Sequence, residues 1–204
     1  MRRNDQFKDG NEENMKSDTK YLVTMFLMVW AGSAYAHPGH FNDMMGFFAG
    51  FSHPFSGVDH LLSMFAIGLL AGQRGGKAIM LVPVVCLLAM ALACTAAISG
   101  LVISFSEMGI LLTLVVSGVL LACRVKLSLP LLLPLVGMFS LFHGYAHGLE
   151  MPFNAKGFEY GVGLVAGSSL LLLAGMLTSL KGREKIVAYL GAATAVVGLS
   201  LLVV

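Results

Sequence analysis

The sequence predicts an all-α membrane protein, in which six transmembrane helices follow a cleaved signal peptide and both mature termini lie outside the cytoplasm. Three observations lead to this fold class. First, 57% of the 204 residues are hydrophobic and only 12% are charged, whereas soluble globular domains carry about 25% charged residues. Second, an export signal stands near the N-terminus. Third, the rest of the chain divides into apolar blocks, most of them close to the length of a membrane-spanning helix.

The segment that begins at Met15 has the organisation of a secretory signal peptide. "MKSDTK" supplies a lysine-bearing start, "YLVTMFLMVW" an apolar core, and "AGSAYA" an A-x-A cleavage site at Ala34 and Ala36. We therefore expect residues 1–36 to be removed and His37 to begin the mature chain, with Met15 as an alternative start of translation. An uncleaved signal anchor is the other interpretation, although the apolar core is shorter than the ~20 residues that a spanning helix needs.

The mature chain, residues 37–204, is predicted to form one six-helix transmembrane domain. Four Gly-x-x-x-Gly pairs would let its helices approach closely. Residues 41–52 are expected to extend the first apolar block as a half-helix. The blocks cover residues 58–72, 78–99, 104–123, 128–147, 159–180 and 186–204.

The connections between these blocks alternate in basic character. Three of them carry lysine or arginine, and the others are almost free of both. By the positive-inside rule the basic connections are cytoplasmic, which places both mature termini outside. The basic residues are Arg74 and Lys77 in one connection, Arg124 and Lys126 in the next, and Lys181, Arg183 and Lys185 in the last.

Acidic residues gather on the opposite, outer side. Lys156 is the only basic residue there, so the outer face should attract cations. The net charge of +2 gives no support to a nucleic-acid partner, because five of the 13 basic residues lie among the first 20 positions. The outer acids are Asp43, Asp59, Glu107, Glu150 and Glu159.

The three cysteines, Cys86, Cys94 and Cys123, lie within apolar runs and show no CxxC spacing. Free cysteine is among the most buried residue types. We therefore expect buried small side chains rather than disulfides or zinc ligands.

All six histidines fall in three short stretches, each of which also contains Asp or Glu. Ionisable side chains at membrane depth are costly and usually line a site or a pathway. Imidazole and carboxylate groups together suit first-row divalent metals such as Ni, Co, Zn and Cu. The sequence therefore predicts a divalent metal ion as partner. The stretches are "HPGHFND" with His37, His40 and Asp43, "HPFSGVDH" with His53, Asp59 and His60, and "FHGYAHGLE" with His143, His147 and Glu150.

In the third stretch, spacings of four and seven residues place His143, His147 and Glu150 on one face of a helix. Two imidazoles and a carboxylate would converge there. A single histidine on such a helix would more often be a hydrogen-bonded packing residue.

The second stretch predicts a helix start. Ser56 is the expected N-cap, so a helix should begin just before Asp59 and His60, and His53 should lie on the lead-in loop and fold back towards them. The first span runs inward and the fourth runs outward. The second and third stretches are therefore expected at the same depth.

The first stretch would form a metal-collecting site after cleavage behind Ala36. His37 would then offer its α-amine and its imidazole as a chelating pair, with His40 and Asp43 close by. Because Pro38 has no amide hydrogen, successive backbone amides cannot lock the metal in place. A labile site is expected, and the other interpretation is a solvated, poorly ordered terminus.

The spacing of "HPFSGVDH", with "FHGYAHGLE" downstream and "HPGH" just behind the signal peptide, resembles the signature motifs of the HupE/UreJ family of bacterial nickel and cobalt transporters. The resemblance covers the whole mature chain. It implies a secondary permease of the inner membrane for Ni²⁺, with Co²⁺ as the second candidate, which serves hydrogenase or urease maturation and has no prosthetic group. It implies roles for His37, Asp59, His60, His143, His147 and Glu150, with His40, Asp43 and His53 as weaker additions.

Two other functions fit part of the pattern. "FHGYAHGLE" offers three ligands that can hold zinc with an open position for water, as in an intramembrane hydrolase, but Gly144 stands where an HExxH motif has its glutamate. A b-type haem protein would need one histidine on each of two facing helices and leaves the carboxylates unexplained. No Walker A motif is present, and the favoured interpretation is a carrier rather than an enzyme, with a homo-oligomer left open.

Overall fold

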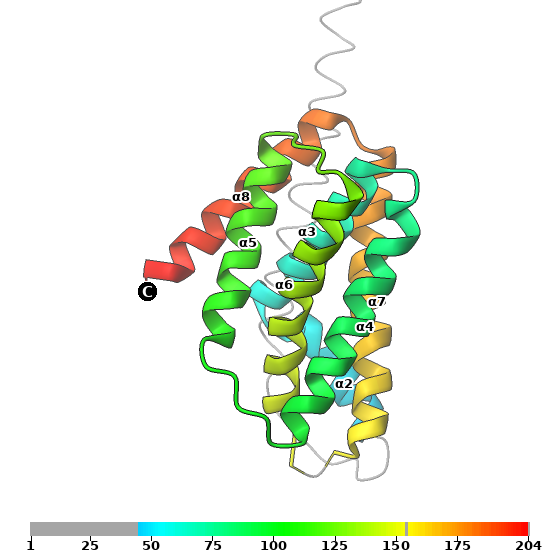
Figure 1. Ribbon diagram of the computed structural model, residues 1–204, viewed down its shortest axis with the longest axis vertical. Coiled ribbons are helices and arrows are strands. Elements are labelled where there is room, and N and C mark those ends of the chain that lie inside the picture. Colours follow the sequence, from blue (N-terminus) through cyan, green and yellow to red (C-terminus); the bar gives the residue numbers. More distant parts are fainter. Residues whose placement is uncertain (1–44, 154, 204) are drawn as a thin grey trace, which may run out of the picture. The chain divides into compact units, whose positions relative to one another are not determined.

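The computed structural model describes residues 45–153 and 155–203, and within them all regular structure is helical (Figure 1). The predicted signal peptide and the "HPGHFND" stretch, with His37, His40 and Asp43, lie outside the described residues. The helices are α2 (Met45–Ser56), α3 (Val58–Arg74), α4 (Ala78–Ile98), α5 (Ser106–Ala122), α6 (Leu129–Leu149), α7 (Gly157–Lys181) and α8 (Glu184–Val203).

Each of the six predicted blocks is a helix, with ends that agree within three residues. Among the described residues, α4, α6, α7 and α8 are long and apolar enough to cross a membrane, and α2 with α3 passes as one bent span. Helix α5 has 17 residues and is shorter than these. The protein is thus an all-α membrane protein with four or five candidate spans by this measure, while the sixth span and the direction of insertion stay predictions.

The first span is broken between α2 and α3, whose axes differ by 83°. The predicted start of α3 is confirmed, but the N-cap is Gly57 rather than Ser56. Ser56 closes α2 and donates its hydroxyl to the His53 carbonyl. His53 therefore lies in the last turn of α2 and not on a loop.

The break falls at Gly57 for a physical reason. Backbone groups in an apolar setting keep their helical hydrogen bonds where they can, so α2 continues through Pro54 and ends before glycine, a poor helix former. A Cβ on Gly57 would also lie 2.7 Å from an Asp59 carboxylate oxygen. The absent side chain leaves room for the first acidic residue of α3.

Glycines bring the helices into close pairs. Helix α4 packs along α6, α5 along α8, and α7 along both α2 and α3 (Figure 1). A Cβ on Gly144 would overlap the backbone carbonyl of Met90, and one on Gly163 the carbonyl of Phe47. The predicted close approach of Gly-x-x-x-Gly helices is confirmed at these contacts, and it positions the histidine-bearing segments of α2, α3 and α6.

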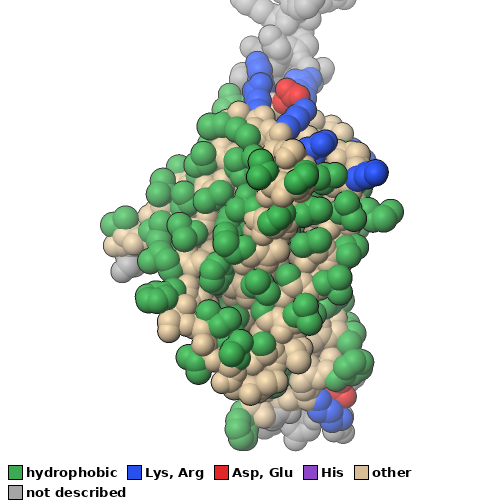
Figure 2. Space-filling view, in the orientation of Figure 1, with side chains coloured by type: hydrophobic (Ala, Val, Ile, Leu, Met, Phe, Trp, Pro, Cys, Tyr) green, Lys and Arg blue, Asp and Glu red, His purple; other side chains and the backbone are tan. Residues whose placement is uncertain are grey.

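The outer surface is apolar along the helices and basic at one end (Figure 2). Large side chains such as Met80, Leu92 and Val196 are well exposed, as a lipid-facing surface requires. Lysine and arginine side chains gather at the end that holds the connections predicted to be cytoplasmic. The separation of charge from the apolar surface fits a chain embedded in a bilayer.

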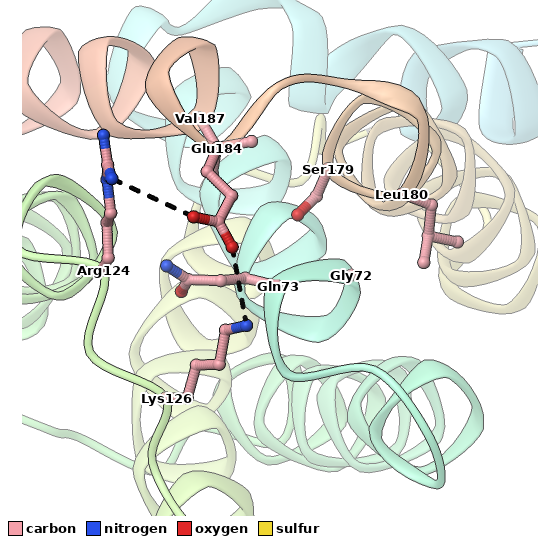
Figure 3. A pocket seen from close by; sticks show the side chains of 8 residues that line it. All are labelled: Gly72, Gln73, Arg124, Lys126, Ser179, Leu180, Glu184 and Val187. Atoms are coloured by element: carbon pink, nitrogen blue, oxygen red, sulfur yellow. Dashed lines mark ion pairs between the residues drawn. The ribbon is translucent and has the colours of Figure 1, made fainter.

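At the basic end, a cavity of about 200 Å³ lies between α3, the end of α5, α7 and α8. Figure 3 shows Glu184 in it between Arg124 and Lys126, each at 3.9 Å from a carboxylate oxygen. No histidine lines this cavity. Its full lining is Gly72, Gln73, Arg124, Lys126, Ser179, Leu180, Glu184 and Val187.

Two of the three cysteines follow the expectation from the sequence. Cys86 and Cys94 are buried, but Cys123 is exposed and that expectation was wrong. The reason is that α5 ends at Ala122, which leaves Cys123 as the C-cap beyond the packed helix face.

Candidate metal site

Four side chains from distant parts of the chain converge on one point. His53, His60, His147 and Glu150 each offer a ligand atom, and these atoms all lie within 4.8 Å of one another. The Glu150 Oε2 atom is 2.9 Å from His53 Nε2 and 3.8 Å from His60 Nε2. Three imidazoles and one carboxylate therefore share a single small volume.

The broken span brings the first two ligands together. His53 closes α2 and His60 opens α3. In an unbroken helix seven residues would rise by ~10.5 Å, whereas the centroids of these two rings are 6.0 Å apart. The bend at Gly57 thus brings two histidines that are seven residues apart in the chain close enough to be ligands of one ion.

The other two ligands come from the end of α6. His147 lies in its last turn, and Glu150 is the residue that caps it. The His147 ring is 4.6 Å from the His60 ring and 4.8 Å from the His53 ring, between centroids. The expected meeting of the second and third histidine stretches is thus what the structure shows.

Several ring nitrogens at the centre have no hydrogen-bond partner among the described residues. Within the part of the chain that the structure describes, both nitrogens of His60 and of His147 are buried without a hydrogen bond. Buried polar atoms are normally hydrogen-bonded, and each exception requires an explanation. A neutral imidazole carries one lone pair, so a bound cation would satisfy one nitrogen of each ring, and the donor set fits a first-row divalent metal.

Asp59 lies beside the cluster and not among its four ligands. One of its carboxylate oxygens is 3.0 Å from His60 Nδ1, on the side of the ring away from the nitrogen nearest Glu150. The negative charge of this carboxylate favours a proton on Nδ1. Such a carboxylate beside a ligating histidine selects its tautomer and leaves the other nitrogen free for metal.

His143 is one helical turn deeper than His147. It is fully buried, its Nδ1 is 2.9 Å from the Phe139 carbonyl oxygen, and Nε2 has no partner among the described residues. The His143 and His60 rings are 5.6 Å apart. The structure therefore brings His147 and Glu150 into the four-ligand group and places His143 next to it.

The cluster opens to its surroundings at Glu150. This side chain is half exposed, while the His53 side chain is 19% exposed and His147 is fully buried. The hydrogen bond with His53 holds the pKa of the Glu150 carboxyl below its usual value, against the raising effect of partial burial. The entrance to the site therefore carries a negative charge.

Tyr160 supports the site and was not identified from the sequence. Its hydroxyl donates to the backbone carbonyl of His147 over 3.1 Å, and its ring lies 5.9 Å from that of His53. This residue is fully buried in α7. A tyrosine near the start of an apolar block gives no signal of such a role, because tyrosine is common at membrane interfaces.

The arrangement of the three histidine rings in the cluster argues against haem binding between them. A macrocycle between two histidines needs two imidazoles on opposite sides of an open plane. Here the rings of His53, His60 and His147 contact each other edge to face or tilted. That packing leaves no room for a porphyrin within the cluster.

Comparisons with known proteins agree on one family. The family model described as "HupE / UreJ protein" matches residues 25–201. The curated "Protein HupE" of Rhizobium leguminosarum bv. viciae is 36% identical over 189 residues, which cover 91% of this chain and 98% of that protein. No solved structure matches.

These matches decide between the classes of function considered above. HupE/UreJ proteins are transporters and not enzymes, so the zinc hydrolase interpretation is wrong. The predicted resemblance to this family is confirmed, and the match covers nearly the whole chain. The chain belongs to the HupE/UreJ family, whose membrane proteins are linked to nickel and cobalt uptake for hydrogenase and urease.

Proposed function

We propose that this protein is a secondary permease that takes up Ni²⁺ across the bacterial inner membrane and supplies hydrogenase or urease maturation, with Co²⁺ as the second candidate cargo. One observation carries the proposal: His53, His60, His147 and Glu150 converge from three helices. Partnerless nitrogens at their centre add to it. Membership of a family that is linked to nickel and cobalt uptake supports these two ions as the cargo.

The spacing of the four ligands supports a small divalent ion. At metal–ligand distances of ~2.1 Å, neighbouring ligand atoms lie ~3.0 Å apart around an octahedral ion and ~3.4 Å apart around a tetrahedral one. The separations from Glu150 Oε2, 2.9 Å to His53 and 3.8 Å to His60, bracket these values. All four ligand atoms lie within 4.8 Å of one another, so the side chains would draw together around a bound ion.

The site also suits a carrier that releases its cargo. The imidazole and carboxylate ligands of this entry site suit Ni²⁺ and Co²⁺. The ion would enter past Glu150, which is half exposed, and replace the contact between Glu150 and His53. It would then reach the buried nitrogens of His60 and His147. In this proposal the "HPGHFND" stretch, with His37, His40 and Asp43, collects the ion outside.

Voltage is a sufficient driving force. Moving two positive charges down an inside-negative potential yields ~4.6 kcal/mol per 100 mV. The chain contains no Walker A motif for ATP hydrolysis. Facilitated entry of a divalent cation therefore needs no other energy source, and exchange against protons on histidine is the competing form of coupling.

The proposal is tested by uptake of radioactive nickel into cells that express the wild type, His147→Ala or Glu150→Gln. We expect both variants to lose uptake by roughly tenfold or more, because each removes a ligand. Glu107→Gln is the matched control, since Glu107 is an exposed acid in the first turn of α5 and outside the cluster. If cells that express the wild-type protein took up neither nickel nor cobalt, the proposed function would be refuted. If both variants took up nickel at the wild-type rate, the proposed site would be refuted.

A further inference from the structure

A second group of metal-binding side chains lies deeper in the helix bundle than the four-ligand cluster. Cys86 of α4 and Met64 of α3 are fully buried, and their sulfur atoms are 4.0 Å apart. Neither sulfur takes part in the proposed entry site.

The packing of α4 against α6 fixes the depth of this group. Gly148 contacts the backbone of Cys94, and Gly144, one turn deeper, contacts the backbone of Met90. Continuing by one more turn along both helices pairs Ser140 with Cys86. The sulfur pair therefore lies about two helical turns deeper in the bundle than Gly148. This depth separates the sulfur pair from the four-ligand cluster at the end of α6.

His143 lies between the two levels. Its Nδ1 is engaged by the Phe139 carbonyl, which leaves Nε2 as the free lone pair, and that nitrogen is buried with no partner among the described residues. Ser63 lies in the turn of α3 that joins His60 to Met64, and its buried hydroxyl also has no hydrogen-bond partner among the described residues. Two partnerless polar atoms in a fully packed region indicate a ligand that the protein itself does not provide.

The sulfur spacing is right for shared coordination. At a metal–sulfur distance of ~2.3 Å, a separation of 4.0 Å corresponds to a sulfur–metal–sulfur angle of about 120°. Cys86 would bind as the thiolate and release its proton when the ion arrives. Thiolate and thioether groups prefer softer cations, and an imidazole nearby extends the range to Ni²⁺ and Co²⁺. Beyond this level the described core is closed by apolar side chains that are at most 2% exposed: Ile67, Leu132, Val136 and Leu172.

We propose that Cys86, Met64 and His143 form a second cation site, which receives the ion from the four-ligand cluster and holds it before the apolar seal opens. The inference rests on the proposed transport function. It assigns the sulfur site the role of a selectivity step, because imidazole and carboxylate ligands alone do not separate Ni²⁺ and Co²⁺ from the other first-row divalent ions that such ligands bind. Soft ions should then compete with nickel at this position.

The test measures nickel uptake, and its inhibition by Cd²⁺, in cells that express Cys86→Ser or Met64→Leu. Both substitutions keep the approximate side-chain size and remove the sulfur. The matched controls are Cys123→Ser and Met80→Leu, since both residues are exposed outside the site. Variant protein in the membrane is quantified, and Ni²⁺ binding to purified protein is measured by calorimetry.

We expect the two variants to bind Ni²⁺ at the entry cluster like the wild type but to transport it roughly tenfold more slowly, with a higher Cd²⁺ concentration needed to inhibit them. Wild-type rates in both variants would overturn the sulfur site and leave the permease intact. Slower nickel uptake with unchanged relative inhibition by Cd²⁺ would also overturn it, because that result describes a packing role. A wild type without nickel or cobalt uptake would instead refute the proposed function.

Discussion

His53 Nε2 and Glu150 Oε2 lie 2.9 Å apart, although 97 positions separate the two residues in the chain. The contact joins the end of the short helix α2 to the end of α6. Both atoms belong to the same candidate ligand group as His60 and His147. An arriving cation would therefore replace a contact that already holds the site together.

Nickel should stabilise the protein measurably. A ligand that binds only the folded state at 100 times its dissociation constant contributes ~2.7 kcal/mol, so Ni²⁺ should raise the midpoint of thermal unfolding in detergent. A chelator should reverse the shift. His147→Ala should show little shift at the same Ni²⁺ concentration, and an equal shift in that variant would place the bound ion elsewhere.

Asp59→Asn should weaken the binding of nickel less than His60→Ala does. The aspartate lies 3.0 Å from His60 Nδ1 but outside the four-ligand group, so its loss affects the tautomer of the ligand and not the ligand itself. A roughly tenfold loss of nickel affinity is expected for such a neighbouring carboxylate. Calorimetry of both variants provides the comparison, and a larger loss for Asp59→Asn would make this carboxylate a direct ligand.

Tyr160→Phe should lower stability with little effect on cargo choice. The substitution removes the hydroxyl that donates to the His147 carbonyl, and a hydrogen bond of this kind contributes ~1 kcal/mol. Tyr189→Phe is the control, because Tyr189 is exposed. Thermal unfolding of the two variants checks the prediction. Equal midpoints would show that the bond has no net effect on stability.

Gly163→Ala should loosen the contact between α2 and α7. The added methyl group would overlap the Phe47 carbonyl, and overpacking typically costs ~1–3 kcal/mol. Gly161→Ala in the same helix is the matched control, since a Cβ there meets nothing within 4 Å. Because α2 carries His53, nickel affinity should fall in the first variant and stay unchanged in the second.

Much of the fold follows from local sequence properties. The apolar blocks predict helices α3 to α8 with ends within three residues, because a membrane-length run of apolar residues has few alternatives to a helix. The ligand types were likewise predictable, since ionisable groups are rarely placed at membrane depth without a role. The N-cap of α3 and the helical placement of His53 were not, because Ser56 indicated a cap after a loop, whereas α2 continues to Ser56 and the break falls at Gly57.

The sequence pointed to the side chains that could bind a metal ion: three histidine stretches, each with a carboxylate, in a chain of apolar blocks. Which of these side chains lie within reach of one another depends on the tertiary structure. It joined His53 and Glu150 to His60 and His147, set Asp59 beside the group, and placed His143 one turn deeper. The reason is that the 83° bend and the glycine contacts between helices are relations between distant segments, which local periodicity does not contain.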